Sequence, residues 1–274
     1  MSERHPIGVY VTLGNEYEGE LRLLKDVGIS SVQLDWMSVP LQNDDPSVIC
    51  GILEELNLSL SAVFVMLEEA DWTSLSTVHK TLGFSHPERR QARLEMGKKI
   101  ASTVADLGVK VFASHLGRIP TSKYDPNYSS VRDAVVELAD HCQSLGMKLS
   151  FETGPEPAYE LRGFIEDCAC PSIGVNLDPT NFVLYGSDAP LRAVEELAPY
   201  ILDTHIKDGK WPTKADQLGE AVAMGEGDVP IRQVISAIHA TGYLGPLTIE
   251  GEGGGSLAKA VEFLNNEQEK ALGN

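Results

Sequence analysis

The segment SLGMKLSFE, residues 144–152, contains one copy of the unit from which this chain is built. Gly146 follows a helix-like amphipathic pattern, and a glycine at that point can adopt the left-handed conformation that closes a helix. The next residues, KLSFE (148–152), form the short apolar run typical of a buried strand and end on Glu152. The segment therefore predicts a helix, a short turn and a strand whose carboxyl end carries an acidic side chain.

The same arrangement repeats along the whole sequence. The strand candidates are IGVYV (7–11), SVQLD (31–35), LSAVFV (60–65), VKVFAS (109–114), KLSFE (148–152), IGVNLD (173–178), LDTHI (202–206) and LTIE (247–250). Amphipathic segments separate them and end on Gly28, Gly108, Gly146 and Gly242, with Asn57 in the same position once. Eight such units in 274 residues average about 34 residues each, close to the size of a strand–helix repeat. We expect an α/β protein, a single (β/α)8 TIM barrel that spans residues 1–274 as one domain.

Four consecutive strands in the second half end on side chains that bind divalent metals. These are Glu152, Asp178, His205 and Glu250, separated by 26, 27 and 45 residues. Any one of them alone would be explained by helix capping or by packing. All strand ends of a parallel barrel meet at one rim, however, so the four together predict one metal site. Three carboxylates and one imidazole favour Mn²⁺, Mg²⁺ or Co²⁺, with Zn²⁺ as the alternative.

Two strand-to-helix connections, residues 66–86 and 207–229, are long. Loops of this length are uncommon unless they are functional or disordered. In a barrel they lie on the same face as the four candidate ligands, so we expect them to border the site.

The composition argues against several classes of function. With 40 acidic and 22 basic residues the formal charge is −18, and no concentrated basic patch is visible for binding nucleic acid. The first residues lack a signal-peptide pattern, and no run approaches the ~20 apolar residues needed to cross a bilayer. The four cysteines have no disulfide-framework or CxxC spacing. We expect a cytoplasmic protein that binds neither nucleic acid nor membrane.

Four stretches of the sequence carry a family resemblance that extends over essentially the whole chain: FETGPE (151–156), NLDPTN (176–181), THIKDG (204–209) and the tail from Met224 to Glu252. The chain resembles the xylose isomerase-like barrel superfamily, and within it the one-metal sugar isomerases and epimerases, of the ketose 3-epimerase and inosose dehydratase type. The resemblance implies that Glu152, Asp178, His205 and Glu250 hold the ion. It also implies that Glu152 and Glu250 act as acid and base on opposite faces of the substrate. A homo-oligomer is a further expectation by analogy alone.

Four more residues are expected to contact substrate. Lys207 has the same strand parity as His205, Glu156 follows Glu152 in its loop, and His115 ends the fourth strand. Asn181 is the fourth, and it stands where the resemblance implies a histidine in the ketose epimerases and the endonucleases. This departure places the expected substrate contacts in question.

The sequence thus predicts a divalent-metal-dependent isomerase or epimerase that transfers a proton through a metal-stabilised enediolate of a carbohydrate or polyol. The second hypothesis is a dehydratase of a keto-inositol or related polyol, which would expel a hydroxyl group instead of returning the proton. The third is an apurinic endonuclease-like phosphodiesterase, disfavoured by the charge and by the third strand, which ends in VFVML without a histidine. The fourth is a non-catalytic sugar-binding barrel.

Overall fold

A computed structural model describes residues 4–12, 17–36, 47–66, 70–251 and 255–273. Eight parallel strands form a closed barrel in the order β1-β10-β7-β6-β5-β4-β3-β2. The barrel strands are β1 (Ile7–Val11), β2 (Ser31–Asp35), β3 (Ser59–Val65), β4 (Val111–His115), β5 (Lys148–Glu152), β6 (Ile173–Leu177), β7 (Ile201–Ile206) and β10 (Leu247–Ile249). Every predicted strand is present, with bounds that differ from the expected ones by at most two residues at either end. The (β/α)8 barrel is therefore confirmed.

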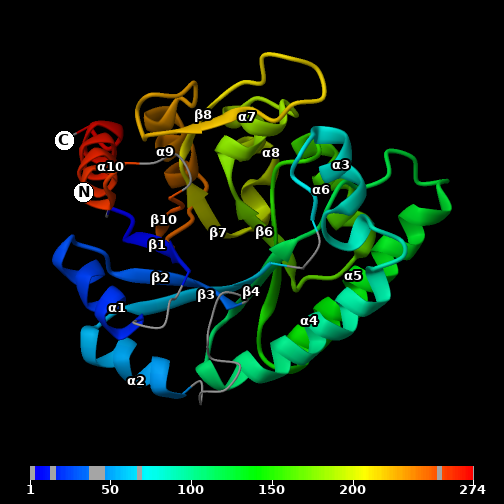
Figure 1. Ribbon diagram of the computed structural model, residues 1–274, viewed down its shortest axis with the longest axis horizontal. Helices are drawn as coiled ribbons and strands as arrows, with labels where there is room; N and C mark the ends of the chain where they lie inside the picture. The colour runs from blue at the N-terminus through cyan, green and yellow to red at the C-terminus, as the bar shows by residue number, and fades with distance from the viewer. Residues whose placement is uncertain (1–3, 13–16, 37–46, 67–69, 252–254, 274) are drawn as a thin grey trace.

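Helices are arranged around the barrel strands (Figure 1). They are α1 (Tyr17–Asp26), α2 (Ser47–Leu56), α3 (Leu75–Thr81), α4 (Arg90–Val104), α5 (Pro126–Ser144), α6 (Ala158–Cys168), α7 (Pro179–Tyr185), α8 (Pro190–Leu197), α9 (Ile231–Ala240) and α10 (Leu257–Ala271). Short 3-10 turns are η3 (Gly83–Ser85), η4 (Ala105–Leu107) and η5 (Ala198–Tyr200). Within the described residues, none of the helices combines the length and the hydrophobicity that crossing a bilayer requires. The helix-closing residues adopt the expected left-handed conformation, for example Gly146 at φ 77° and Asn57 at φ 54°.

The two long connections contain secondary structure of their own. The first includes α3 and η3, and the second includes an antiparallel hairpin of β8 (Asp208–Lys210) and β9 (Glu220–Val222). The hairpin packs on α7, where the Gly219 N–H donates to the Leu184 carbonyl at 2.7 Å. A small cluster of Val78 from α3, Leu82 directly after α3 and Tyr185 from α7 also packs against Leu218 of the second connection. These connections thus form a packed layer over one end of the barrel.

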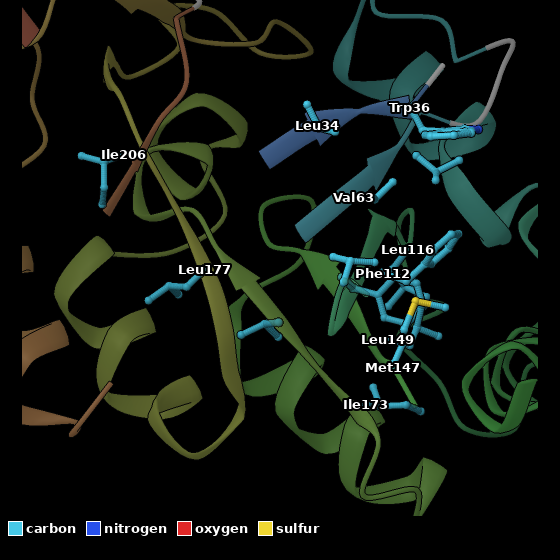
Figure 2. Packing of buried hydrophobic residues seen from close by; sticks show 14 of the residues in the cluster. Leu34, Trp36, Val63, Phe112, Leu116, Met147, Leu149, Ile173, Leu177 and Ile206 are labelled. Carbon is cyan, nitrogen blue, oxygen red and sulfur yellow. The ribbon is translucent and has the colours of Figure 1, made fainter. Parts of the chain in front are cut away.

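In β5, β6 and β10 apolar residues on the outer face alternate with mostly polar residues on the inner face. Leu149 and Phe151 of β5 are fully buried in the hydrophobic core, and Figure 2 shows Leu149 packed with Phe112 of the neighbouring strand. Ser150 alternates with them and therefore points into the barrel. The equivalent inner positions two residues before the other three candidate ligands are Asn176, Asp203 and Thr248, all buried. The barrel interior below the rim is therefore polar and needs internal hydrogen bonds.

Candidate metal centre

The structure brings the four predicted ligands together. One ligand atom from each of Glu152, Asp178, His205 and Glu250 can be chosen so that all four lie within 4.8 Å of one another. Glu152 is the last residue of β5, Asp178 follows β6, His205 is in β7 and Glu250 follows β10. Within the described residues these four are the group of His, Cys, Asp and Glu side chains that could hold a metal ion. The convergence arises because neighbouring parallel strands deliver their carboxyl ends to the same rim.

The two carboxylate oxygens of Asp178 have different roles: one caps a helix and the other faces the centre. Its Oδ1 accepts hydrogen bonds from the N–H groups of Thr180 (2.8 Å) and Asn181 (3.2 Å), so Asp178 is the N-cap of α7. Its Oδ2 lies 2.9 Å from Lys207 Nζ. The side chain has no exposed surface, and capping holds it in one orientation.

His205 presents Nδ1 to the carboxylates. Nδ1 lies 2.8 Å from Glu152 Oε1 and 3.3 Å from Glu250 Oε2. On its other side Nε2 contacts Gln33 Oε1, and Gln33 Nε2 in turn donates to Asp203 Oδ2 at 2.8 Å. Since an amide oxygen can only accept, the Gln33 contact places a proton on Nε2, which also lies 3.0 Å from Asn176 Nδ2. Nδ1 is then the nitrogen that faces the carboxylates; it donates to them in the protein alone, and its lone pair would face a bound cation. A histidine that binds metal is usually oriented in this way by its second nitrogen.

The centre contains more negative than positive charge. One ammonium group offsets only part of the charge of the three buried carboxylates: Lys207 Nζ forms ion pairs with Asp178 and Glu250. Burial raises the pKa of Asp178 to about 7; Lys207 opposes this shift, while Glu250 and Glu152 reinforce it. Burial also opposes ionisation of Glu250, yet Lys207 and His205 lower its pKa to about 2. A divalent cation would supply the two missing positive charges, so the donor set fits such an ion in both geometry and charge.

Protonation of His205 partly compensates this charge in the protein alone. Burial would lower the pKa of the imidazole, but Glu250 and Glu152 outweigh burial and raise it well above its ordinary value. Glu152 responds in the opposite direction: burial opposes ionisation, and His115 and His205 lower its pKa well below the ordinary value. The same carboxylates that would hold a cation therefore hold a proton on His205.

A cavity of about 350 Å³ opens on this centre. Glu152 and Glu250 line it together with His115, Asn181 and Lys207, whereas Asp178 and His205 are not among its described lining residues. Both long connections contribute to its wall, with Trp72 from the first and Leu218 and Ala221 from the second. The expectation that these connections border the site is confirmed. The volume is near the lower end of the roughly 300–1,000 Å³ typical of small-molecule sites.

Three of the four residues expected to contact substrate lie at this cavity. His115 Nε2 is 2.7 Å from Glu152 Oε2, and Asn181 Nδ2 donates to the Thr153 carbonyl at 3.0 Å. Lys207 lies deeper in the centre than strand parity suggests, since it contacts two of the candidate ligands directly.

Glu156 lies in a different environment. It is 1% exposed, and it is not among the described residues that line the cavity. Burial raises the pKa of Glu156 to about 8; Arg118 opposes the shift and Glu160 adds to it. Its Oε2 has no hydrogen-bond partner among the described residues. The structure therefore gives Glu156 no contact with the four candidate ligands.

Several residues of the site have no signal in the sequence strong enough to select them. Gln33 in β2 orients His205, and Tyr10 and Phe64 place their rings 5.4 Å and 5.7 Å from its imidazole. Burial, together with Asp35 and the two glutamates, raises the pKa of Tyr10. In the sequence, each of these residues is an ordinary member of a predicted strand. The polar residue at the inward position of β2 is the one signal that could have indicated Gln33.

Comparison with known proteins gives a consistent result. The family model described as xylose isomerase-like TIM barrel matches residues 21–267. A xylose isomerase domain protein from Planctomyces limnophilus has a structure similar to this chain, with a TM-score of 0.89, 27% identity, and coverage of 99% of this chain and 100% of that one. A xylose isomerase-like TIM barrel protein from Mycobacterium smegmatis, in complex with magnesium, has a TM-score of 0.70, 18% identity and 98% coverage of both chains. An L-ribulose 3-epimerase has a TM-score of 0.74 and 18% identity over 98% of this chain and 96% of that one. No curated protein sequence matches the chain significantly.

Proposed function

This chain belongs to the xylose isomerase-like TIM barrel family, and on that premise we propose that it is a divalent-metal-dependent isomerase or epimerase of a small carbohydrate or polyol-derived ketone. The observation that carries the proposal is the placement of the two glutamates. Glu152 and Glu250 both line the cavity, and β6 and β7 separate their strands around the barrel. The two carboxylates thus reach the cavity from strands that are not neighbours, and we propose that they serve as acid and base on different faces of the substrate.

The proposed metal residues are Glu152, Asp178, His205 and Glu250. A bound divalent cation would act as a Lewis acid that stabilises negative charge on the substrate's carbonyl and adjacent hydroxyl oxygens. The hard oxygen donors favour Mg²⁺, Mn²⁺ or Co²⁺, and a magnesium complex of a similar barrel agrees with this preference.

The chain's own side chains would move the proton. One glutamate removes the proton from the carbon next to the carbonyl group, and the same or the other glutamate returns it. Return to the neighbouring carbon gives isomerisation, and return to the opposite face gives epimerisation. His115 fixes Glu152 Oε2 at 2.7 Å, and Lys207 fixes Glu250 Oε2, so both carboxylates are oriented before substrate arrives. His115, Asn181 and Lys207, which line the cavity, are the further proposed substrate contacts. Glu156 is not among the described lining residues, and its expected substrate contact stays a prediction.

Replacement of each glutamate by glutamine tests the proposal. Glu152→Gln and Glu250→Gln keep the side-chain shape but remove the base, so incorporation of solvent deuterium into ketose substrates should fall by at least about 100-fold. Exposed Glu88 offers a matched control, Glu88→Gln, that should keep wild-type exchange. Calorimetric titration with Mn²⁺ would report metal binding separately. Full exchange in either cavity variant that still binds metal would refute the assignment.

A dehydratase is the second candidate, and one observation favours it. Asn181 stands where the resemblance implies a histidine in the ketose epimerases, and its side chain donates to the Thr153 carbonyl. The substrate contact of those epimerases is therefore changed here. Product mass separates the two reactions, because dehydration removes 18 Da (one water) from the substrate and proton transfer alone leaves its mass unchanged.

A further inference from the structure

The described residues that line the cavity divide into a polar group and a larger apolar group. The polar group consists of the glutamates with His115, Asn181 and Lys207. The apolar wall comprises Phe64, Met66, Trp72, Leu184, Tyr185 and Leu218. A substrate that offers its carbonyl and hydroxyl oxygens to the carboxylate centre must therefore direct its remaining part towards hydrocarbon and aromatic rings.

This apolar wall is a packed structure. Tyr185 from α7, Val78 from α3 and Leu82 directly after α3 form a small buried cluster of their own, and Leu218 packs against it. The second connection is fixed further by the hydrogen bond between Gly219 and Leu184. The wall is therefore built by three segments distant in sequence, and its apolar character is a property of the tertiary structure.

The polar groups at the cavity already have protein partners. The Asn181 amide donates to Thr153, the His115 imidazole contacts Glu152, and the Lys207 ammonium contacts Asp178 and Glu250. Among the described lining residues, few further polar groups are available to bind hydroxyls far from the carboxylates. A hydroxyl group buried against the apolar wall would lose its water without gaining an equivalent partner, which is unfavourable.

The described residues of the cavity also offer no unpaired cation for a phosphate group. Lys207 is the one lysine or arginine among the described residues that line the cavity, and two carboxylates neutralise it. The internal segments outside the described residues are 13–16, 37–46, 67–69 and 252–254. None of the four contains a lysine, arginine or histidine, and each contains at least one acidic residue. Wherever these segments lie, their side chains cannot neutralise a phosphate.

We infer that the substrate is an uncharged carbonyl compound whose end remote from the carboxylate centre is non-polar, such as a deoxyketose, and that phosphorylated sugars are excluded. The inference rests on the proposed function and adds the substrate class to it. Burial of a phosphate dianion beside an acidic and apolar surface without a counter-charge is strongly unfavourable. A methyl group in the same place gains from the apolar wall.

Matched compounds that differ at one carbon test the inference. The Mn²⁺-loaded protein is offered each D-ketohexose, its 6-deoxy analogue and its 6-phosphate. Two readouts are recorded: solvent-deuterium incorporation by NMR, and binding by quenching of tryptophan fluorescence, with Trp72→Phe identifying the signal from the cavity. For at least one ketohexose series, the 6-deoxy compound should equal or exceed its parent in kcat/KM and in affinity. The 6-phosphate should be at least about 100-fold poorer in both.

The two proposals fail in different ways. Exchange of the 6-phosphate at the parent's rate, or a loss of tenfold or more for every 6-deoxy compound, overturns the substrate class and leaves the proposed function intact. Absence of exchange from all compounds overturns the proposed function. The binding readout then still decides the substrate class: preferred binding of 6-deoxy compounds supports it, and binding of the phosphates, or of no compound, overturns it.

An added charge provides the converse test. Leu218→Arg places a guanidinium at the apolar wall, and it should improve the affinity of a ketose 6-phosphate relative to its parent by about tenfold or more. Leu218→Gln removes the same apolar side chain without adding charge and should leave that ratio unchanged. Leu244→Arg adds the same charge at a position that is 80% exposed and should also leave it unchanged. An unchanged ratio in a folded Leu218→Arg protein contradicts the exclusion of phosphate by charge.

Discussion

At the scale of single residues, the centre depends on side chains inside the barrel that contact His205 on the side away from the carboxylates. Gln33 accepts from His205 Nε2 and donates to Asp203, and Asp203 also accepts from the Thr204 N–H at 2.8 Å. Burial raises the pKa of Asp203, and the hydrogen bonds that it accepts counteract that shift. Contacts inside the barrel thus fix the orientation of the His205 ring, with Nδ1 facing the carboxylates.

Replacement of Gln33 should weaken metal binding without touching a ligand. Gln33→Met removes the acceptor that holds the proton on His205 Nε2, and loss of such an outer contact typically costs 10–100-fold in metal affinity. Calorimetric titration with Mn²⁺ measures the effect, and thermal unfolding verifies that the variant is folded. Exposed Gln143 provides the control variant Gln143→Met. Wild-type affinity in folded Gln33→Met would show that Gln33 has no part in orienting His205.

Glu156 should make stability depend on pH. The folded protein keeps the Glu156 proton up to a pKa of about 8, whereas the ordinary value is 4.5. Between these values the folded state binds more protons than the unfolded state, so the free energy of unfolding falls as pH rises, by at most about 1.4 kcal/mol per pH unit from this group. Glu156→Gln removes this contribution and should become progressively more stable than wild type from pH 5 to pH 8.

Urea unfolding across this pH range checks the expectation, with Glu88→Gln as the control for an exposed glutamate. A stability difference between Glu156→Gln and wild type that stays constant with pH would mean that Glu156 is ionised in the folded protein.

At the scale of elements, α7 links the fold to the site. Asp178 caps it through Oδ1, and the helix carries Asn181, Leu184 and Tyr185 to the cavity wall. Because the cap and the candidate ligand are the same side chain, the helix is positioned relative to the centre. Strand β6 ends at Leu177 and α7 begins at Pro179, so Asp178 alone connects them and no loop intervenes.

Two substitutions at Asp178 separate these roles. Asp178→Asn and Asp178→Ala both remove the carboxylate and should both lose metal affinity in calorimetric titration. Asparagine can still cap α7, so the metal-free alanine variant should be less stable than the asparagine variant by about 0.5–2 kcal/mol. Urea unfolding of the two metal-free variants measures this difference. Equal stability would indicate that the Oδ1 contacts contribute nothing to α7.

At the scale of the whole molecule, barrel closure concentrates charge in a small volume. Strands β5, β6, β7 and β10 are consecutive neighbours in the barrel, and they place three carboxylates around one imidazole. Among the described residues, Lys207 and a proton held on His205 offset this charge in the protein alone. The folded barrel therefore presents a preformed cluster of ligand atoms that could hold a divalent cation and that the unfolded chain lacks.

A divalent cation should accordingly stabilise the barrel. Binding to the folded state alone adds about 2.7 kcal/mol at a concentration 100-fold above Kd. Thermal unfolding should shift upward with Mn²⁺ or Mg²⁺, return with EDTA, and remain unchanged with NaCl of equal ionic strength. Asp178→Asn should abolish the shift. A shift of equal size in that variant would place the ion elsewhere.

The sequence by itself determined the barrel and the chemical type of its centre. Short apolar runs and helix-closing residues such as Gly146 are local patterns, and they predicted every barrel strand. Because parallel strands share one rim, the residue types at the strand ends also predicted the convergence of Glu152, Asp178, His205 and Glu250.

Only the tertiary structure decided which other side chains meet there. Contacts such as Gln33 with His205, and Lys207 with Glu250, depend on the register and closure of the barrel. The apolar wall depends on how α3, α7 and the second connection pack. Such contacts join residues far apart in the chain, and no local pattern of hydrophobicity or charge encodes the distance between them.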